Sequence, residues 1–534
     1  MTTRIFNRIF TLSFVFCILT AALFAQPELD ISFNGTGRIT TNLSAGYDIV
    51  YGLLVQPDNK IVAVGTFSSN EGRGHFALAR YNTNGSLDPS FGAGGTVITD
   101  FDPTAVDQGV FAAALQPDGK ILATGFTNVF TPGTGHIATA RYNTNGSLDA
   151  TFGTGGKVQT AIVQHINEGH AIAVGQDGKI VVAGLYFSGN QNFQTVIVRY
   201  DSAGGLEGTT TDTRGFLLGE ANVASGVTIQ PDGKIVTAGA YASGQSGSAG
   251  SDLTMLRLTP SGAYDTTFVG GGRLLVPSPG VSEGLSAVAV QPDGRIVAAG
   301  GSNGNFLVMR FDANGGPDPT FNGSGRVTTA MGGSSRATAL IVRPNGKIVV
   351  SGISGQDFAV AYYNADGSLD TSFSGDGKLT FNFDGNPSSA NSMAIDNLGR
   401  IVLGGTSGPT IGNNSSFAVA RLYTLDPVPV TITGRTLTQN GQPVRGVNIT
   451  ITGTSGQSLQ TTTSSLGYYQ FQVMSGQTYT LTPSLKRYRF QPKVVAANES
   501  IADLDFTGQS SQDGLAAAKP APKRETADLP GGKN

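Results

Sequence analysis

The chain has 534 residues, a length that suits two or more domains rather than one. Hydrophobic residues make up 39% of it, which is enough for packed cores, while only 13% of the residues are charged and none is tryptophan. With a net charge of −3 and no basic patch, nucleic acid is excluded as an expected partner. The 75 glycines recur at fixed offsets among Val, Ile, Phe and Thr, as turns between short strands do. The composition therefore predicts an all-β protein.

Residues 1–25 have the pattern of a secretory signal peptide. Arg4 and Arg8 precede an apolar run that ends at Phe24, and Ala25 offers a cleavage site. An uncleaved anchor helix is the alternative, because the run is close to the lower limit for a membrane span. Cys17, the sole cysteine, lies in this segment, so the exported chain would carry no disulfide. We expect a protein that is secreted or held at the cell envelope or surface, with no transmembrane segment after cleavage.

Residues 26–425 repeat one motif. Each unit has an Ala-rich strand, a turn such as Gln116-Pro-Asp-Gly-Lys120, a Val/Ile strand ending in Gly, a variable loop, a strand ending in Ala-Arg-Tyr, an Asn-Gly-Ser-Leu-Asp-x-x-Phe-Gly segment and a short Val/Thr strand. The basic residue after each turn marks seven units: Lys60, Lys120, Lys179, Lys234, Arg295, Lys347 and Arg400. Proline fixes φ in these turns and glycine takes the positive φ that ends them. Repeats of this length with four short strands predict a seven-bladed β-propeller of four-stranded blades.

The alanines predict the radial order of the strands. The strand before each turn is rich in small residues, such as Ala112, Ala113 and Ala287, which suits crowding at the axis of a ring. We therefore expect this strand innermost and the Val/Thr strand outermost. The segment from Arg38 to Leu43 would then pair with the strand Phe417–Leu422, so that both ends of the region seal the ring and leave no open sheet edge. An open β-solenoid with the same period is the alternative.

The units resemble the delta-60 repeat family of bacterial exported proteins. The residues that carry the resemblance are Gln116 to Gly125, Ala140 to Asn143 and Gly146 to Gly153, and the similarity extends over about residues 30–425. The resemblance implies a repeat architecture and no particular activity. One unit departs from the pattern, because Leu206 to Phe216 replaces the Ser-Leu-Asp-x-x-Phe-Gly segment, which leaves its outer loop undefined.

The C-terminal part follows a Pro-rich linker at residues 426–430. Residues 431–508 read as short strands, the last expected from Ile501 to Phe506. The segments Gly441–Val447, Thr463–Phe471 and Tyr488–Pro492 resemble those of a carboxypeptidase regulatory-like domain. That resemblance implies a small Ig-like or transthyretin-like β-sandwich without catalytic function. Residues 509–534 have no apolar pattern and are expected to be a disordered tail.

The four histidines are weighed as possible ligands. His75 and His136 hold the same repeat position, where other units place Gln194, Asp252, Asn305, Asp357 and Ser416. A position that accepts any polar residue indicates the start of a strand at the surface. His165 and His170 flank Glu168 in a loop-like stretch, where a metal site is a weak alternative.

Three further motifs are explained by structure rather than chemistry. Gly300 to Gly304 matches a Gly-x-Ser-x-Gly pattern, but it lies between two expected strands and no histidine follows it. The segment Asn82 to Asp88 and its counterparts suit β-turns, with calcium binding as the alternative. The arginines that precede the aromatic residue are expected to donate hydrogen bonds between blades: Arg80, Arg141, Arg199, Arg310 and Arg421.

The sequence assigns no catalytic, cofactor-binding or metal-binding residue, so we expect no cofactor, with calcium as the exception just named. The predicted function is a non-enzymatic binding or structural/adhesion protein, expected to be a monomer, that uses the propeller to contact an extracellular protein or glycan. Variable loops would supply the contacts: residues 66–75, 126–136, 185–194, 240–251 and 406–416. Two alternatives stay open, a polysaccharide-acting enzyme with a site in the propeller channel and a calcium-stabilised surface scaffold.

Overall fold

The computed structural model describes residues 29–510 except 69–72, 102–106, 129–134, 163–165, 188–192, 213–220, 243–250, 279, 411–413, 424–428, 454–457, 476 and 498–499. The described chain is all-β, as predicted, with strands β1 to β36 and a single helical turn, α1 (Val269–Gly272). In these ranges no helix has the length and apolar character that a membrane crossing requires. The predicted signal peptide lies outside the described residues.

The repeat region is built from antiparallel units of four strands. The first strands are β2 (Asp48–Val55), β6 (Gln108–Leu115), β10 (Asn167–Val174), β14 (Ala221–Ile229), β18 (Glu283–Val290), β22 (Ser335–Val342) and β26 (Ser388–Ile395). The second strands are β3 (Ile61–Ser68), β7 (Ile121–Thr127), β11 (Ile180–Phe187), β15 (Ile235–Ala242), β19 (Ile296–Ser302), β23 (Ile348–Ser354) and β27 (Ile401–Ser407).

The third strands are β4 (Gly74–Tyr81), β8 (His136–Tyr142), β12 (Phe193–Tyr200), β16 (Ser251–Leu258), β20 (Asn305–Phe311), β24 (Asp357–Tyr363) and β28 (Ser416–Leu422). The fourth strands are β5 (Thr96–Thr99), β9 (Lys157–Thr160), β13 (Leu206–Asp212), β17 (Arg273–Val276), β21 (Arg326–Thr329), β25 (Lys378–Phe381) and, from the N-terminal end, β1 (Arg38–Thr41).

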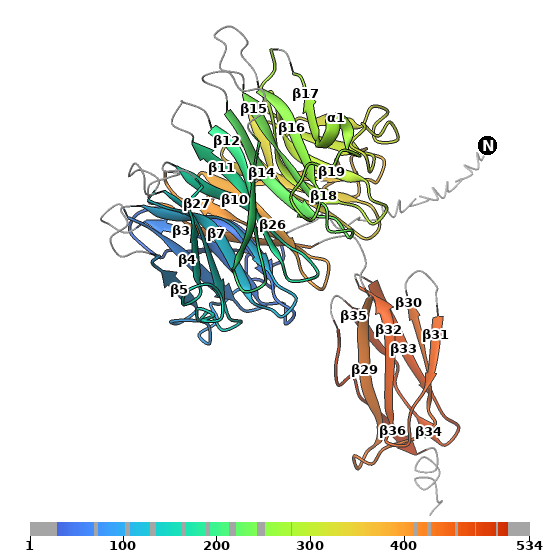
Figure 1. The fold of residues 1–534 in the computed structure, drawn as a ribbon. Coiled ribbons are helices and arrows are strands. Elements are labelled where there is room, and N and C mark those ends of the chain that lie inside the picture. Colours follow the sequence, from blue (N-terminus) through green and yellow to red (C-terminus); the bar gives the residue numbers. More distant parts are fainter. Residues whose placement is uncertain are drawn as a thin grey trace, which may run out of the picture.

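The sheets form a propeller-like ring (Figure 1). Each sheet runs in the order first, second, third, fourth strand, and a single parallel bridge from Phe193 to Ala221 joins two units into one eight-stranded sheet. The first strands of successive units pack against one another, and β26 packs back on β2. The strand β1 pairs with β28, with Arg38 opposite Ala420, so the predicted pairing of the two ends is confirmed. The region is therefore closed and is not an open solenoid.

The hydrophobic cores lie between neighbouring units. On β4, Ala77 and Ala79 belong to a core cluster shared with β27 and β28, whereas Phe76 and Leu78 belong to one shared with β6 and β7. All four side chains are fully buried. The period-two alternation of this strand thus separates two buried faces, and not a buried face from a solvated one, because a sheet in a ring is covered on both sides.

The C-terminal unit has two four-stranded sheets. One has the order β32 (Tyr468–Met474), β29 (Pro429–Thr438), β36 (Phe506–Ser510) and β34 (Tyr488–Arg489). The other has the order β31 (Ser458–Thr462), β30 (Asn448–Gly453), β33 (Gln477–Ser484) and β35 (Lys493–Ala497). Residues of both sheets, among them Ile432, Ile449, Phe471 and Leu481, form one core cluster.

Three boundaries differ from the sequence-based expectation. The last strand, expected from Ile501 to Phe506, is observed as β36 and begins at Phe506. Residues 502–505 form no ladder, and Phe506 is the first residue that pairs with β29, opposite Thr436. Strand β36 reaches Ser510, which pairs with Tyr488, so residues 509 and 510 belong to a strand and not to the expected tail. The rest of that expected tail, residues 511–534, lies outside the described range. The expected linker overlaps β29, and its first three residues are not described.

Candidate functional site

Every first strand carries a β-bulge at the same place. The register with the second strand skips one residue in each unit: Tyr51, Phe111, His170, Ser225, Ser286, Thr338 and Asn391. A bulge leaves one residue out of the ladder and re-aims its side chain. The same seven positions therefore differ from the rest of the strand in where they point.

A glycine inside each second strand makes room for this bulge, because the strand continues beyond the glycine at which the sequence motif ends it. A Cβ atom on Gly125 would lie 1.9 Å from the carbonyl oxygen of Gly109, on the opposite strand just before the bulge. The counterparts would meet a carbonyl oxygen at 1.8–2.1 Å: Gly65, Gly184, Gly239, Gly300, Gly352 and Gly405. No other residue fits these positions, which explains why the repeat has glycine at this point of the strand.

The bulged residues line one cavity of about 300 Å³ at the centre of the ring. Residues of β2, β6, β10, β14, β18, β22 and β26 contribute to its wall, including Ala112, Ala113 and Ala287. The prediction that the Ala-rich strand is innermost is therefore confirmed. We call this cavity the central channel.

The wall of the central channel is aromatic on one side. Tyr51 meets Phe111 edge to face at a centroid distance of 5.5 Å, and Phe111 stacks on the His170 ring at 4.7 Å. Behind them, Phe126 of β7 supports Phe111 at 5.2 Å. Burial raises the pKa of the Tyr51 phenol, which therefore keeps its proton at neutral pH. His170 Nε2 lies 2.8 Å from Glu168 Oε2, which fixes the orientation of the imidazole ring.

The other side of the wall is small and polar. Asn391 Nδ2 donates to the carbonyl oxygen of Val50 at 3.0 Å, and Thr338 Oγ1 donates to that of Ala390 at 2.9 Å. These two side chains link first strands of neighbouring units. The hydroxyl groups of Ser225 and Ser286 make no hydrogen bond to any residue that the structure describes, so they are the polar groups that a ligand in the channel would meet.

The predicted inter-blade arginines form a second recurrent cluster, which we call the blade clamp and describe at Arg141. Its Nε lies 2.7 Å from Asp149 Oδ2, its Nη2 donates to Thr151 Oγ1 at 3.1 Å, and its guanidinium carbon lies 4.7 Å from the centroid of the Phe152 ring. Nη1 donates to the carbonyl oxygen of Ser202 in the next unit. Lys120 Nζ also pairs with Asp149, at 3.0 Å.

The acid of the clamp is held in its charged form. Burial alone would raise the pKa of Asp149, but the hydrogen bonds from Thr151 and Lys120 and the charge on Arg141 hold that pKa well below its usual value. Arg141 and Asp149 are 5% and 4% exposed, so water does little to screen the pair. The ion pair and the cation–π contact thus lie within one unit and hold the guanidinium in place, and its hydrogen bond to the Ser202 carbonyl oxygen joins that unit to the next.

Equivalent clamps join four other units. They are Arg80 with Asp88 and Phe91, Arg257 with Asp265 and Phe268, Arg310 with Asp318 and Phe321, and Arg421 with Asp30 and Phe33. Sequence reasoning missed Arg257 and the N-terminal members. The segment Leu29-Asp-Ile-Ser-Phe33, which matches the Leu-Asp-x-x-Phe part of the repeat's own pattern, would have revealed the latter.

Two units lack the clamp. In one, Tyr362 takes the place of the arginine, stacks on Phe373 at 5.3 Å and lies beside Lys347, which pairs with Asp370 at 2.7 Å. In the other, Arg199 donates to the carbonyl oxygen of Pro260 in the next unit at 3.2 Å, so the predicted inter-blade bond is present without the acid and the phenyl ring.

The histidines lie mostly where the sequence suggested. His75 and His136 are at the start of β4 and β8, as expected. The imidazole ring of His75 contacts Asp100 and stacks on Phe67, so it is half-buried rather than at the surface. Glu168 and His170 lie on strand β10, not in a loop, because the bulge breaks the alternation that would have indicated a strand. His165 is outside the described residues, and those residues contain no group of three metal-ligating side chains.

The remaining motifs are structural. Ser302 ends β19 before a tight turn, is 5% exposed and donates to Glu283 Oε1 at 2.5 Å, so it is no exposed nucleophile. In the Asn82–Asp88 segment, Asn84 Oδ1 accepts from the Ser86 amide at 3.0 Å, while Asp88 pairs with Arg80 and Lys60. Turn bonds and ion pairs occupy the oxygens that calcium would need. Each of the five variable loops contains residues outside the described range, so their predicted role stays a prediction.

Known families match both parts of the chain. A family described as a domain of unknown function (DUF5122) beta-propeller matches residues 56–91, 116–152, 175–206, 230–268, 291–321 and 343–373. The carboxypeptidase regulatory-like domain family matches residues 431–508. No curated protein matches the chain significantly.

Several solved structures are similar at low identity. A virginiamycin B lyase from Staphylococcus aureus is 12% identical, with 73% of this chain and 98% of that chain covered and a TM-score of 0.43. The periplasmic gluconolactonase of Pseudomonas aeruginosa is 12% identical, covering 71% and 100%, with a TM-score of 0.39. PorZ, a surface component of the type-IX secretion system of Porphyromonas gingivalis, is 12% identical, covering 82% and 67%, with a TM-score of 0.35. Similarity this low carries no argument about function. The chain is a protein of DUF5122 beta-propeller repeats, across residues 56–373, followed by a carboxypeptidase regulatory-like domain at residues 431–508.

Proposed function

We propose that the chain is an exported, non-enzymatic binding protein whose repeats close as a seven-bladed propeller and bind a glycan end in the central channel. The observation that carries the proposal is the division of the channel wall into an aromatic side and a hydroxyl side. A sugar ring has an apolar face, which packs on aromatic rings, and an edge of hydroxyl groups, which need hydrogen-bond partners. Phe111 and Tyr51 suit the first need and Ser225 and Ser286 the second.

The chemistry of the wall favours binding over hydrolysis. Hydrolysis of a glycosidic bond generally uses two carboxylic acids on either side of the scissile bond. Among the described residues that line the central channel, none is an acid, and Tyr51 and His170 are the titratable ones. The C-terminal unit, which we take to be an Ig-like or transthyretin-like sandwich, would then hold the ring away from a surface or add a second contact.

A binding screen tests this proposal. The exported chain, residues 26–534, is applied to arrays of glycans and cell-wall polymers, with calcium and with a chelator. For a hit, the affinity of Phe111→Ala is compared with that of Tyr468→Ala, which removes an aromatic ring 51% exposed on the C-terminal unit. We expect Phe111→Ala to weaken binding at least about tenfold and Tyr468→Ala to leave it unchanged.

Three outcomes would overturn the proposal. They are silence of the array under both conditions, equal affinities for Phe111→Ala and the unsubstituted chain, and release of new reducing ends from the bound glycan, which would mark an enzyme. Binding that depends wholly on calcium would place the contact outside the channel and favour the calcium-stabilised scaffold.

A further inference from the structure

The unit built from β10 to β13 has lost the loop that carries the blade clamp. Leu206 pairs with Tyr200, as Leu87 pairs with Tyr81 in an intact unit, so Glu207 is the counterpart of Asp88. After Glu207 the chain continues directly in β13 as Gly-Thr-Thr, where the intact unit has Pro-Ser-Phe. In the described part of this unit, the hydroxyl and the phenyl ring of the clamp are therefore missing, and the acid is displaced.

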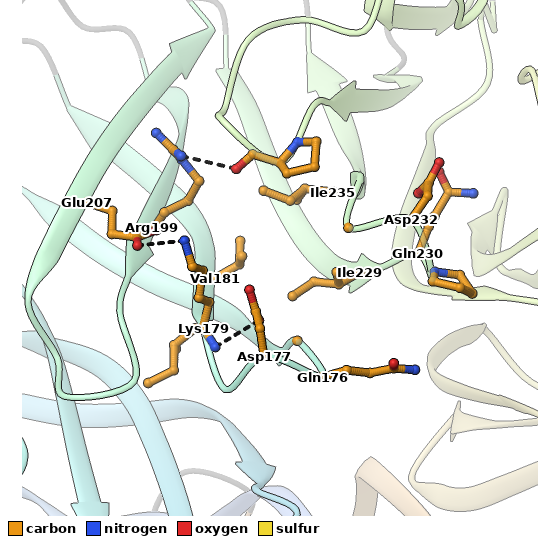
Figure 2. A pocket seen from close by; sticks show the side chains of 15 residues that line it. Gln176, Asp177, Lys179, Val181, Arg199, Glu207, Ile229, Gln230, Asp232 and Ile235 are labelled. Carbon is orange, nitrogen blue, oxygen red and sulfur yellow. Dashed lines mark hydrogen bonds and ion pairs between the residues drawn. The ribbon is translucent and has the colours of Figure 1, made fainter.

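A pocket of about 360 Å³ lies at this position, between the unit and the next one (Figure 2). Its apolar wall comes from two neighbouring sheets: Ile180, Val181, Ile229, Pro231, Ile235 and Pro260. In an intact interface, Phe152 fills the space between the corresponding strands, in one core cluster with Ile180 and Val182. We call this pocket the open interface.

Arg199 is left without its clamp partners in the open interface. Gly262 and Gly204 hold the same repeat position in two units, so a Cβ atom added to each shows what lies beside it. On Gly262 this atom would meet Arg199 Nε at 2.7 Å, and on Gly204 it would meet the ring of Phe152 at 2.8 Å. The guanidinium group of Arg199 therefore lies near the place that a phenyl ring occupies in an intact unit. Its Nε is buried and has no hydrogen-bond partner. Glu207 pairs instead with Lys179, at 2.7 Å (Figure 2).

The charges around the pocket leave Arg199 as the group that needs an acid. Asp232 pairs with Lys234 at 3.2 Å, and Asp177 Oδ1 accepts from the Lys179 amide at 3.1 Å. Arg199 pairs with no carboxylate among the residues that the structure describes. A ligand that brings a carboxylate would thus pair with a half-buried guanidinium whose Nε is buried without a partner, and an aromatic ring on the same ligand would cover the apolar wall.

We propose that the open interface binds a segment of a partner protein in which an acidic residue stands three positions before an aromatic one, in the manner of the chain's own Asp-x-Ser/Thr-Phe clamps. The intact units show within this molecule that the same arginine, between the same kinds of strand, takes an acid and a phenyl ring together. This site is separate from the central channel and does not depend on the glycan proposal.

A peptide from the chain itself is the probe. The peptide Leu-Asp-Pro-Ser-Phe-Gly, which repeats residues 87–92, is labelled with a fluorophore and titrated with the exported chain in an anisotropy assay. We expect saturable binding that weakens at least about tenfold in Arg199→Gln, and equally when alanine replaces phenylalanine in the peptide. Arg295→Gln, which removes a cation at the turn position that Lys179 holds in this unit, and the channel variant Phe111→Ala should bind as the unsubstituted chain does.

Hydrogen exchange keeps the test decisive should Arg199→Gln fail to fold. Saturating peptide should slow amide exchange in residues 175–181 and 229–235 of the unsubstituted chain and leave residues 116–122 unchanged. Absence of saturable binding up to about 1 mM, the usual limit of weak specific association, would overturn the proposal. So would binding that Arg199→Gln leaves intact, or protection that appears at other units.

Discussion

Breaking one blade clamp should destabilise the ring far more than the same substitution in the open interface. The perturbation is Arg141→Met, which keeps the apolar stem and removes the guanidinium. Arg141 is 5% exposed and contacts Asp149, Thr151, Phe152 and a carbonyl oxygen of the next unit. Removing one partner of a buried ion pair costs about 3–5 kcal/mol, because the other charge stays buried. Since Lys120 still pairs with Asp149, we expect a loss near the lower end, about 3 kcal/mol.

Arg199→Met is the matched control, because Arg199 occupies the same repeat position but makes one hydrogen bond, to Pro260 at 3.2 Å. Its loss should cost about 1 kcal/mol or less. Both variants are unfolded in urea and followed by circular dichroism, with hydrogen exchange of residues 136–160 and 193–212 to locate the change. Equal losses of stability in the two variants would refute the view that the acid and phenyl ring of the clamp hold neighbouring units together.

Three further predictions follow from the described contacts. Burial favours the neutral form of Glu283, but hydrogen bonds from Arg326, Ser278 and Ser302 outweigh the effect of burial and lower the pKa of Glu283 to about 2 from 4.5. The charged form therefore stabilises the fold above pH 4.5. This contribution, up to about 3 kcal/mol, is lost as the pH falls toward 2. Urea unfolding at several pH values should show the stability gap between the chain and Glu283→Gln shrinking over that range, and a gap independent of pH would contradict the assignment. Gly125→Ala should lower the thermal midpoint by more than Gly94→Ala, because its Cβ would lie 1.9 Å from the Gly109 oxygen, whereas at Gly94 the Cβ meets nothing within 4 Å and only the strain of a positive φ is added. Similar midpoints would mean that the bulge relaxes easily. Deleting residues 26–44 removes β1 and the clamp partners of Arg421 and exposes the edge of β28. Light scattering should then show self-association through this edge. A monomer with an unchanged thermal midpoint would argue against closure of the ring by pairing of β1 with β28.

The candidate site was only partly predictable from the sequence. The repeats indicated which strand is innermost, since alanine marks it, and the central channel confirms that order. They did not indicate that Tyr51, Phe111 and His170 gather on one side, because each bulge shifts the alternation by one residue and re-aims the side chain. The open interface was visible in the sequence as a departure at Leu206, but its consequence, a pocket beside Arg199, depends on strands of the next unit.

The sequence by itself determined the all-β class, the repeat and the turns, because glycine and proline positions and strand periodicity are local properties of the chain. It also indicated the closure of the ring, through an outer strand placed at the N-terminal end. The tertiary structure alone decided which groups meet: the acid, hydroxyl and phenyl ring around the arginine of a clamp, the carbonyl oxygen that this arginine reaches in the next unit, and the carbonyl oxygen that requires Gly125. Within the Arg141 clamp these groups are only 8 to 11 positions apart, but the arginine also meets a carbonyl oxygen 61 positions away, and the distances follow from how strands and neighbouring sheets pack rather than from any local pattern.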